Sequence, residues 1–370
     1  MKFVRKFYQD TGFIFAAVLF YLLTRLYHIT SLPIFTDEAI YTRWAQIAKQ
    51  DANWRFISLT DGKQPLFIWM SMVVMKFVND PLLAGRAVSV MAGFATCVGI
   101  FFLSEKLFRS KKVGFLASFL YLIYPFGLVY DRIGLYDSLV ACLSVWALYF
   151  EVLLVKRRRL DTALVLGMVL GLGVLTKTSA FFSIYLLPFS LLLFDVKEKK
   201  RLSEFLKWGF FAGIATLLAY VYYSVLRLSP FFHIIAEKNT IFVYPLSEWL
   251  SHPFTFFTGN VQGLLSWIFT YMTFPIVFLV LLSFVLGRKE YVREKLLLFS
   301  WFVLPLLALA LFGKVLYPRF ILFMTIPLLP LASYSIRAIV RNIKKCFVGK
   351  FLFCNKVICV CRKQKCICKF

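Results

Sequence analysis

The chain of 370 residues is 61% hydrophobic and 19% aromatic, well above the apolar share of a soluble domain. Its apolar residues form long uncharged runs, which excludes a soluble globular protein and indicates several membrane crossings. The formal net charge of +25 could suggest nucleic-acid binding, but the cations are interspersed between the apolar runs. That pattern is typical of loop charges that set orientation in a membrane, so we expect no nucleic-acid partner.

The first apolar run follows a basic start and is too long, without a small-residue cleavage site, for a cleaved signal peptide. We interpret it as a spanning helix. Similar runs recur along the chain, and about 20 residues at 1.5 Å rise cross a hydrocarbon core of about 30 Å. The run at 180–194 is short and contains Pro188, so it could be a tilted or re-entrant segment. We predict an all-α integral membrane protein with ten spans, at 11–29, 84–104, 113–130, 138–155, 162–176, 180–194, 205–227, 263–286, 296–312 and 320–336.

Orientation follows from the basic residues between these spans. With the N-terminus in the cytoplasm, every inner loop is basic, as the positive-inside rule requires. This predicts a protein of the cell membrane with two large extracytoplasmic loops, 30–83 and 228–262. In the first loop, Thr36 is the expected N-cap of a short amphipathic helix that lies in the membrane interface, with Tyr41 and Trp44 at headgroup depth.

We divide the chain into a membrane domain at 1–338 and a basic, cysteine-containing cytoplasmic tail at 339–370. Six of the eight cysteines lie in the tail, but without a C-x2-C pair or a histidine, which disfavours zinc. A composition change near Lys344 also fits a change of reading frame. The three histidines, His28, His233 and His252, lack metal-ligand spacing, so we expect no metal.

Charged residues gather in four separate outer connections of this topology. Ionisable groups at membrane depth cost several kcal/mol unless they are paired or solvated. A cluster of both signs at one face therefore predicts a functional site rather than a proton path through the bilayer. Its members are Asp37, Glu38, Lys63, Asp131, Arg132, Asp137, Lys177 and Arg319.

These residue types suit transfer of a group from a lipid phosphate. Lys63, Lys177 and Arg319 can neutralise a phosphate or diphosphate at headgroup level. A carboxylate can act as general base on an incoming hydroxyl, and the helix N-terminus beside Asp37 would hold it ionised. Structural roles are the alternatives: capping by the two carboxylates, snorkelling cations, and an ion pair between Arg132 and Asp137.

Six motifs in a fixed order carry a family resemblance. The chain resembles the protein O-mannosyltransferase and lipid A aminoarabinose transferase superfamily, whose members have the C-type glycosyltransferase fold. The resemblance covers roughly residues 11–338. Its motifs are "FTDEAIY", "GKQPLFIWM", "GRAVSVMAGFATCVGIFFLSEKLF", "YDRIGLYDSLVA", "GLGVLTKTSA" and "LYPRFILFMTIPLLPLA".

The resemblance implies an enzyme that transfers one sugar, with inversion, from a polyprenyl-phosphate donor to an acceptor hydroxyl at the outer face. The acceptor would be a glycolipid, a polysaccharide or a protein. The family implies neither a metal nor another cofactor. Acceptor recognition, often assigned to the C-terminal part of the family, is not assigned here, because the chain is shorter than the full-length enzymes.

The resemblance also implies roles for residues of the first outer loop. Asp37 matches the catalytic acidic position, and Glu38 is its paired neighbour. Lys63 matches the lysine of the Lys-Pro-Pro motif, which is implied to contact the donor phosphate. Here the motif reads Lys63-Gln64-Pro65, so the loop lacks one rigidifying proline.

Four further positions match later motifs of the family. Arg132 and Asp137 match its Arg-x-x-x-x-Asp motif, with a structural or substrate-orienting role. Lys177 and Arg319 match basic positions near the donor phosphate. These matches complete the predicted site at the outer face.

The alternative function is a transporter or flippase of lipid-linked saccharides. Transporters place binding groups near the bilayer midplane, often in two related halves. This sequence has no detectable internal repeat, and its charges gather at one face. A structural membrane scaffold would leave the outer charges unexplained. We therefore favour the glycosyltransferase.

Overall fold

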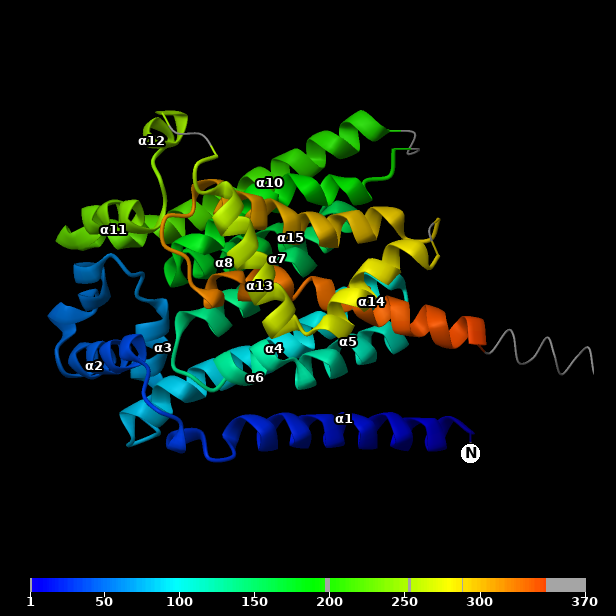
Figure 1. Cartoon of the computed structure of the whole chain (residues 1–370), viewed down its shortest axis with the longest axis horizontal. Helices are drawn as coiled ribbons and strands as arrows, with labels where there is room; N and C mark the ends of the chain where they lie inside the picture. Colours follow the sequence, from blue (N-terminus) through cyan, green and yellow to red (C-terminus); the bar gives the residue numbers. More distant parts are fainter. Residues whose placement is uncertain (1, 197–199, 252–253, 288, 344–370) are drawn as a thin grey trace, which may run out of the picture.

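The computed structural model describes residues 2–196, 200–251, 254–287 and 289–343, and its named elements there are all helices (Figure 1). Within those ranges the only extended pairing is an isolated antiparallel bridge between Val243 and Gly313. The predicted all-α class is therefore confirmed for the described part of the chain. The predicted tail lies outside it from residue 344 onward.

The helices vary widely in length. In chain order they are α1 (Lys2–Leu26), α2 (Thr36–Gln50), α3 (Leu66–Val74), α4 (Pro81–Phe108), α5 (Lys111–Ile123), α6 (Pro125–Tyr130), α7 (Tyr136–Arg157), α8 (Leu160–Thr176), α9 (Phe181–Leu186), α10 (Arg201–Ser224), α11 (Ile234–Phe242), α12 (Leu246–Ser251), α13 (Phe257–Met272), α14 (Phe274–Val285), α15 (Val292–Phe312) and α16 (Leu322–Thr325), followed by the helical residues 328–343.

Four of these helices, α4, α7, α10 and α15, are long and apolar enough to cross a membrane. Three bent pairs of helices raise that number to at most seven within the described residues, by length and composition. Shorter apolar helices occupy the runs predicted at 162–176 and 180–194. The structure thus supports a membrane protein, while the predicted count of ten spans is not confirmed.

Prolines divide several runs that were predicted as single spans. The run 263–286 becomes α13 and α14, which meet at 102° beside Pro275 and Thr273, whose φ is positive (65°). The run 113–130 breaks before Pro125, and Pro188 lies in a 3-10 segment. Proline lacks an N–H and clashes with the preceding turn, so an apolar run of spanning length need not be one straight helix.

Helix α7 is the centre of the bundle. In an apolar stretch of 18 residues, 78% of the residues of α7 are buried, compared with 22% in the corresponding stretch of α10. It packs against α4, α8 and α16, and α8 in turn packs against α10. Residues at the start of α7 are therefore held firmly by the rest of the fold.

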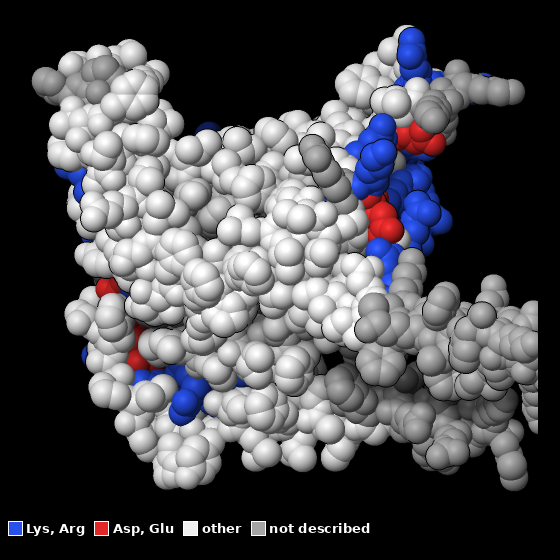
Figure 2. Space-filling model, turned by 45° about the vertical axis from the view of Figure 1, so that its right-hand side comes forward, with Lys and Arg blue, Asp and Glu red and all other residues white. Residues whose placement is uncertain are grey.

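Several short helices and charged side chains lie at the ends of this bundle. Helices α2, α3, α11 and α12 lie together at the end away from the N-terminus (Figure 1). Figure 2 shows charged side chains at two opposite ends, with a broad uncharged surface between them. This distribution matches a bundle whose middle faces lipid and whose ends face water.

Helix α2 begins one residue earlier than the predicted N-cap at Thr36 implied, and its N-cap is Phe35. Thr36 is the first helical residue, and the backbone N–H of Phe35 donates to Glu38, 3.3 Å away. The helix buries Tyr41, Ala45 and Ala48 against α3 and α4. This stripe has the four- and three-residue spacing of one helix face.

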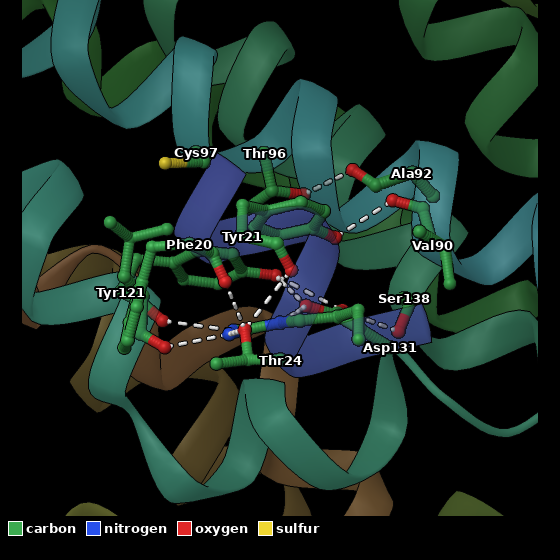
Figure 3. Close-up of polar contacts among 12 residues, drawn as sticks. Phe20, Tyr21, Thr24, Val90, Ala92, Thr96, Cys97, Tyr121, Asp131 and Ser138 are labelled. Atoms are coloured by element: carbon green, nitrogen blue, oxygen red, sulfur yellow. Dashed lines mark hydrogen bonds and ion pairs between the residues drawn. The ribbon is translucent and has the colours of Figure 1, made fainter. Parts of the chain in front are cut away.

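A buried ion pair fastens α1 to the bundle (Figure 3). The Arg25 guanidinium lies 3.6 Å from the Asp131 carboxylate, and both side chains are fully buried. Asp131 also accepts hydrogen bonds from Tyr121 and Ser138, each at 3.0 Å. The sequence placed Asp131 in the outer charged cluster, which is wrong, because this carboxylate is sealed under α1.

Gly93 lies against this ion pair, and its lack of a side chain is required there. A Cβ at this position would collide with the Asp131 carboxylate and the Tyr21 hydroxyl. We expect Gly93→Ala to destabilise the protein by about 1–3 kcal/mol, the usual range for an overpacked core. Gly213→Ala on α10 is the matched control, since its Cβ would enter open space. Equal unfolding temperatures for the two variants in detergent would contradict this packing.

Candidate functional site

Asp37, in the first turn of α2, is the centre of a charged cluster. Its carboxylate accepts a hydrogen bond from the Arg319 guanidinium at 2.6 Å and lies 3.7 Å from the Lys63 ammonium. The three residues come from α2, the turn before α3 and the 3-10 segment Pro318–Ile321. The structure therefore brings together three residues that the sequence assigned to one site.

The two cations also control the protonation of Asp37. Burial alone would raise the pKa of this carboxyl, but the charges of Arg319 and Lys63 outweigh burial and hold the pKa below its ordinary value of 3.8. Asp37 is therefore ionised at neutral pH. An ionised carboxylate can accept a proton, provided that the cations can turn to another anion.

A second ion pair lies beside the first. The Lys177 ammonium donates to the Asp137 carboxylate at 2.7 Å. Lys177 is the C-cap of α8, and Asp137 lies in the first turn of α7. Lys177 also lies 4.6 Å from the ring centre of Phe320, the neighbour of Arg319 in the chain. The predicted phosphate-binding cations thus share one region.

Aromatic rings surround the cations of the cluster. Lys63 lies 4.8 Å from the Tyr41 ring centre, and the Arg319 guanidinium lies 5.2 Å from Tyr317 and 5.5 Å from Phe35. Two guanidinium nitrogens of Arg319, Nε and Nη1, are buried without a hydrogen-bond partner among the described residues. Ring faces stabilise a cation without occupying its N–H donors, which leaves those donors for an anion.

The turn that carries Lys63 is held from two sides. Gly62 has φ +64°, and a Cβ there would lie 2.7 Å from the Ile234 carbonyl of α11. Asp61 accepts from Lys238 of α11 at 2.5 Å and lies 3.4 Å from Lys63. The sequence analysis missed Asp61 and Lys238, because nothing in the sequence indicates that the two outer loops touch.

Gln64 supplies a contact where the family motif has proline. Its side-chain amide is buried and donates to the Thr178 hydroxyl at 2.8 Å. Thr178 directly follows Lys177. The loop therefore gains a hydrogen bond that ties the Lys63 turn to the segment of Lys177, although it lacks one proline.

Glu38 lies in a different environment from its neighbour Asp37. Its carboxylate is buried and accepts two hydrogen bonds from Arg86, both at 2.7 Å, and one from the Gly134 backbone at 2.6 Å. The sequence analysis did not single out Arg86, although an arginine inside an apolar span is a recognisable signal. Glu38 joins α2 to α4 rather than facing the cations around Asp37.

Arg132 also lies apart from the cluster. Its guanidinium donates to the Tyr27 carbonyl at 2.6 Å, whereas the other member of its motif, Asp137, pairs with Lys177. No ion pair between the two motif residues is present. Arg132 therefore contacts the loop after α1, and only Asp137 reaches the candidate site.

Comparisons with known proteins show which family this chain is similar to. The profile described as dolichyl-phosphate-mannose-protein mannosyltransferase matches residues 62–227. Two undecaprenyl phosphate-alpha-4-amino-4-deoxy-L-arabinose arabinosyl transferases are each 25% identical: that of Aeromonas hydrophila over 79% of this chain and 54% of its own length, and that of Yersinia enterocolitica over 86% and 58%. Over these residues the chain is similar to members of the protein O-mannosyltransferase and aminoarabinose transferase superfamily. The predicted resemblance is confirmed.

Solved structures show a similar fold. ArnT from Cupriavidus metallidurans bound to undecaprenyl phosphate superposes with a TM-score of 0.62 at 16% identity, over 95% of this chain and 64% of ArnT. The oligosaccharyltransferase AglB from Archaeoglobus fulgidus, in complex with an inhibitory peptide and a dolichol-phosphate, gives 0.62 at 14% identity, over 94% of this chain and 52% of AglB. Its apolar helices and this shared fold support an integral membrane protein. The chain spans about half the length of the curated relatives it matches.

Proposed function

We propose that this protein is a glycosyltransferase that moves a single sugar, with inversion, from a polyprenyl-phosphate donor to an acceptor hydroxyl. The observation that carries the proposal is an ionised Asp37 held between Arg319 and Lys63. A base beside phosphate-binding cations is the minimum set that such a transfer needs. The names of the similar transferases, and the polyprenyl phosphates bound by ArnT and AglB, support the donor class.

In the proposed reaction the acceptor oxygen attacks the anomeric carbon of the donor. The bond from that carbon to the phosphate oxygen breaks, and its electron pair stays on the phosphate. Arg319, Lys63 and Lys177 stabilise the charge that develops there. As Arg319 and Lys63 turn to the phosphate, the Asp37 carboxylate is released to accept the proton of the acceptor hydroxyl.

The remaining predicted residues take positioning roles in this proposal. Asp137 holds Lys177 by an ion pair, and Glu38 fixes the start of α2 through Arg86. Arg132 holds the loop after α1 by its bond to Tyr27. The contacts of Glu38 favour this role over the direct part in chemistry that the sequence predicted.

We further propose that the site faces the extracytoplasmic side of the cell membrane, with ten spans and α2 in the interface. The separation of charged ends by an uncharged middle supports this topology (Figure 2). The location of α2, α3 and α11 at the end away from the N-terminus supports a cytoplasmic start (Figure 1). The acceptor would approach from the outer side, as a glycolipid, a polysaccharide or a protein.

The test is a transfer assay in proteoliposomes that contain the full chain and a labelled polyprenyl-phosphate sugar. We expect the label to appear on the acceptor fraction and the amount of free polyprenyl phosphate to rise in step. Proteoliposomes without the chain are the control. Movement of intact labelled donor across the vesicle membrane, without any transfer, would overturn the proposal and support a flippase.

A further inference from the structure

A cavity of about 640 Å³ lies at the other end of the bundle from Asp37. Helix α4 joins the two ends: Arg86 contacts Glu38 near its start, and Arg109 follows its last turn, about 35 Å further along at 1.5 Å per residue. The cavity is formed by the end of α4, the turn before α15 and the last helical residues. Its lining is Arg109, Lys289, Glu290, Tyr291, Val292, Arg293, Glu294, Tyr334, Arg337, Ala338 and Arg341.

The charges of this cavity do not balance. Five cations face two carboxylates, and Glu290 is already bound by Arg341 at 3.1 Å and by the Tyr334 hydroxyl at 3.0 Å. Arg109, Lys289 and Arg337 have no ion-pair partner among the described residues. Like charges that share one cavity repel each other, so the site favours an anion that enters between them.

Packing holds the walls of the cavity in place without a ligand. The Phe108 ring stacks on Tyr334 at 5.1 Å and meets Tyr291 at 5.5 Å, so the end of α4 contacts the two other walls. Gly287 has φ +60°, and a Cβ there would collide with the Tyr334 hydroxyl.

The Lys295 ammonium holds the turn at Gly287, between α14 and α15. It donates to the carbonyls of Ser283, Gly287 and Leu286 at 2.7, 3.1 and 3.2 Å, and so ties the last turn of α14 to the residues that follow it. These contacts make the cavity a preformed feature rather than a chance gap between mobile side chains.

We propose that this cavity binds a phosphate group, and that the phosphate is carried by an anionic lipid headgroup. Arginine side chains bind phosphate oxygens through paired N–H donors, and the volume suits a headgroup of a few heavy atoms. The cavity lies at a charged end of the bundle, where lipid headgroups lie and lysine or arginine clusters attract anionic lipids (Figure 2). This site is separate from the proposed transfer site and does not depend on the proposed function.

The test compares two charge-neutralised forms of the full chain in a neutral detergent. Arg109→Gln with Arg337→Gln removes two unpaired cations of the cavity. Lys111→Gln with Lys112→Gln is the matched control, because these exposed lysines lie two and three residues beyond Arg109 but outside the cavity lining. Each form is titrated with phosphatidylglycerol, with phosphatidylcholine and with inorganic phosphate, and bound lipid is counted by native mass spectrometry.

We expect phosphatidylglycerol to bind the wild type and the control alike, and to bind the cavity variant at least about tenfold more weakly. Retention of phosphatidylglycerol in preference to phosphatidylcholine would assign the site to a lipid headgroup. If phosphatidylglycerol does not bind, but inorganic phosphate protects the protein from unfolding in a saturable way, the site would be assigned to a soluble phosphate. If phosphatidylglycerol binding is weakened equally in both variants, or in neither, the proposed site would be wrong.

Discussion

Asp37→Asn is expected to lower the rate of sugar transfer by about two to four orders of magnitude, the usual contribution of a general base. The amide has the size of the carboxylate, so its contacts with Arg319 and Lys63 can persist in part. The amide cannot accept the proton of the acceptor hydroxyl. Donor affinity should stay near the wild-type value, because removing one negative charge leaves the phosphate-binding cations in place.

The measurement is kcat and donor Kd for the variant in proteoliposomes, at matched protein abundance. Asp51→Asn is the control: this aspartate ends the same helix, and its side chain accepts from the Asn53 backbone N–H, a role that asparagine can keep. We expect the control to retain transfer. A slow variant with equally weakened donor binding would instead make Asp37 a residue that only orients the cations.

Composition and hydropathy were sufficient to predict an all-α membrane protein, and they also predicted that the residues of the candidate site lie near one membrane face. Charged residues between apolar runs must lie near a membrane face, so Lys63 and Arg319 could be predicted to share the depth of Asp37 without knowledge of any contact. Their pairing with Asp37, at 3.7 and 2.6 Å, agrees with that reasoning. Depth is predictable because it depends on the order of spans, not on side-chain packing.

The different environments of Asp37 and Glu38 could not be predicted in this way. Successive residues of a helix point about 100° apart, so one of two adjacent carboxylates can face the cations while the other faces the core. Which one does so depends on Arg86, 48 residues later in the sequence. The same limit applies to Asp131, whose partner Arg25 lies on a helix that the sequence does not place against it.

Helix breaks were the second feature that hydropathy could not resolve. An apolar run gives the same average whether it is straight or bent, so 263–286 looked like one span, although its two helices meet at 102°. Only Pro275 marked the position, and proline is tolerated in many membrane helices. The sequence therefore predicted where apolar segments lie better than it predicted their direction.

Glu38→Ala is expected to destabilise the folded protein by about 3–5 kcal/mol, because it leaves Arg86 buried without its counter-charge. The Arg86 side chain is fully buried, and its remaining contacts are backbone carbonyls such as those of Ile29 and Leu32. Since the Gly134 N–H would also lose its acceptor, the start of α2 would lose its bonds both to α4 and to the turn before α7. The measurement is the unfolding temperature in detergent, followed by tryptophan fluorescence.

The double variant Glu38→Leu with Arg86→Leu separates a lost ion pair from a lost contact. Replacing both members of a buried pair with apolar residues is often neutral, so we expect the double variant to unfold at a higher temperature than Glu38→Ala alone. Asp37→Asn should unfold near the wild-type temperature, because its pair is partly exposed. If Glu38→Ala instead kept full stability and lost transfer, the carboxylate would act in the chemistry, and the division between the two neighbours would be reversed.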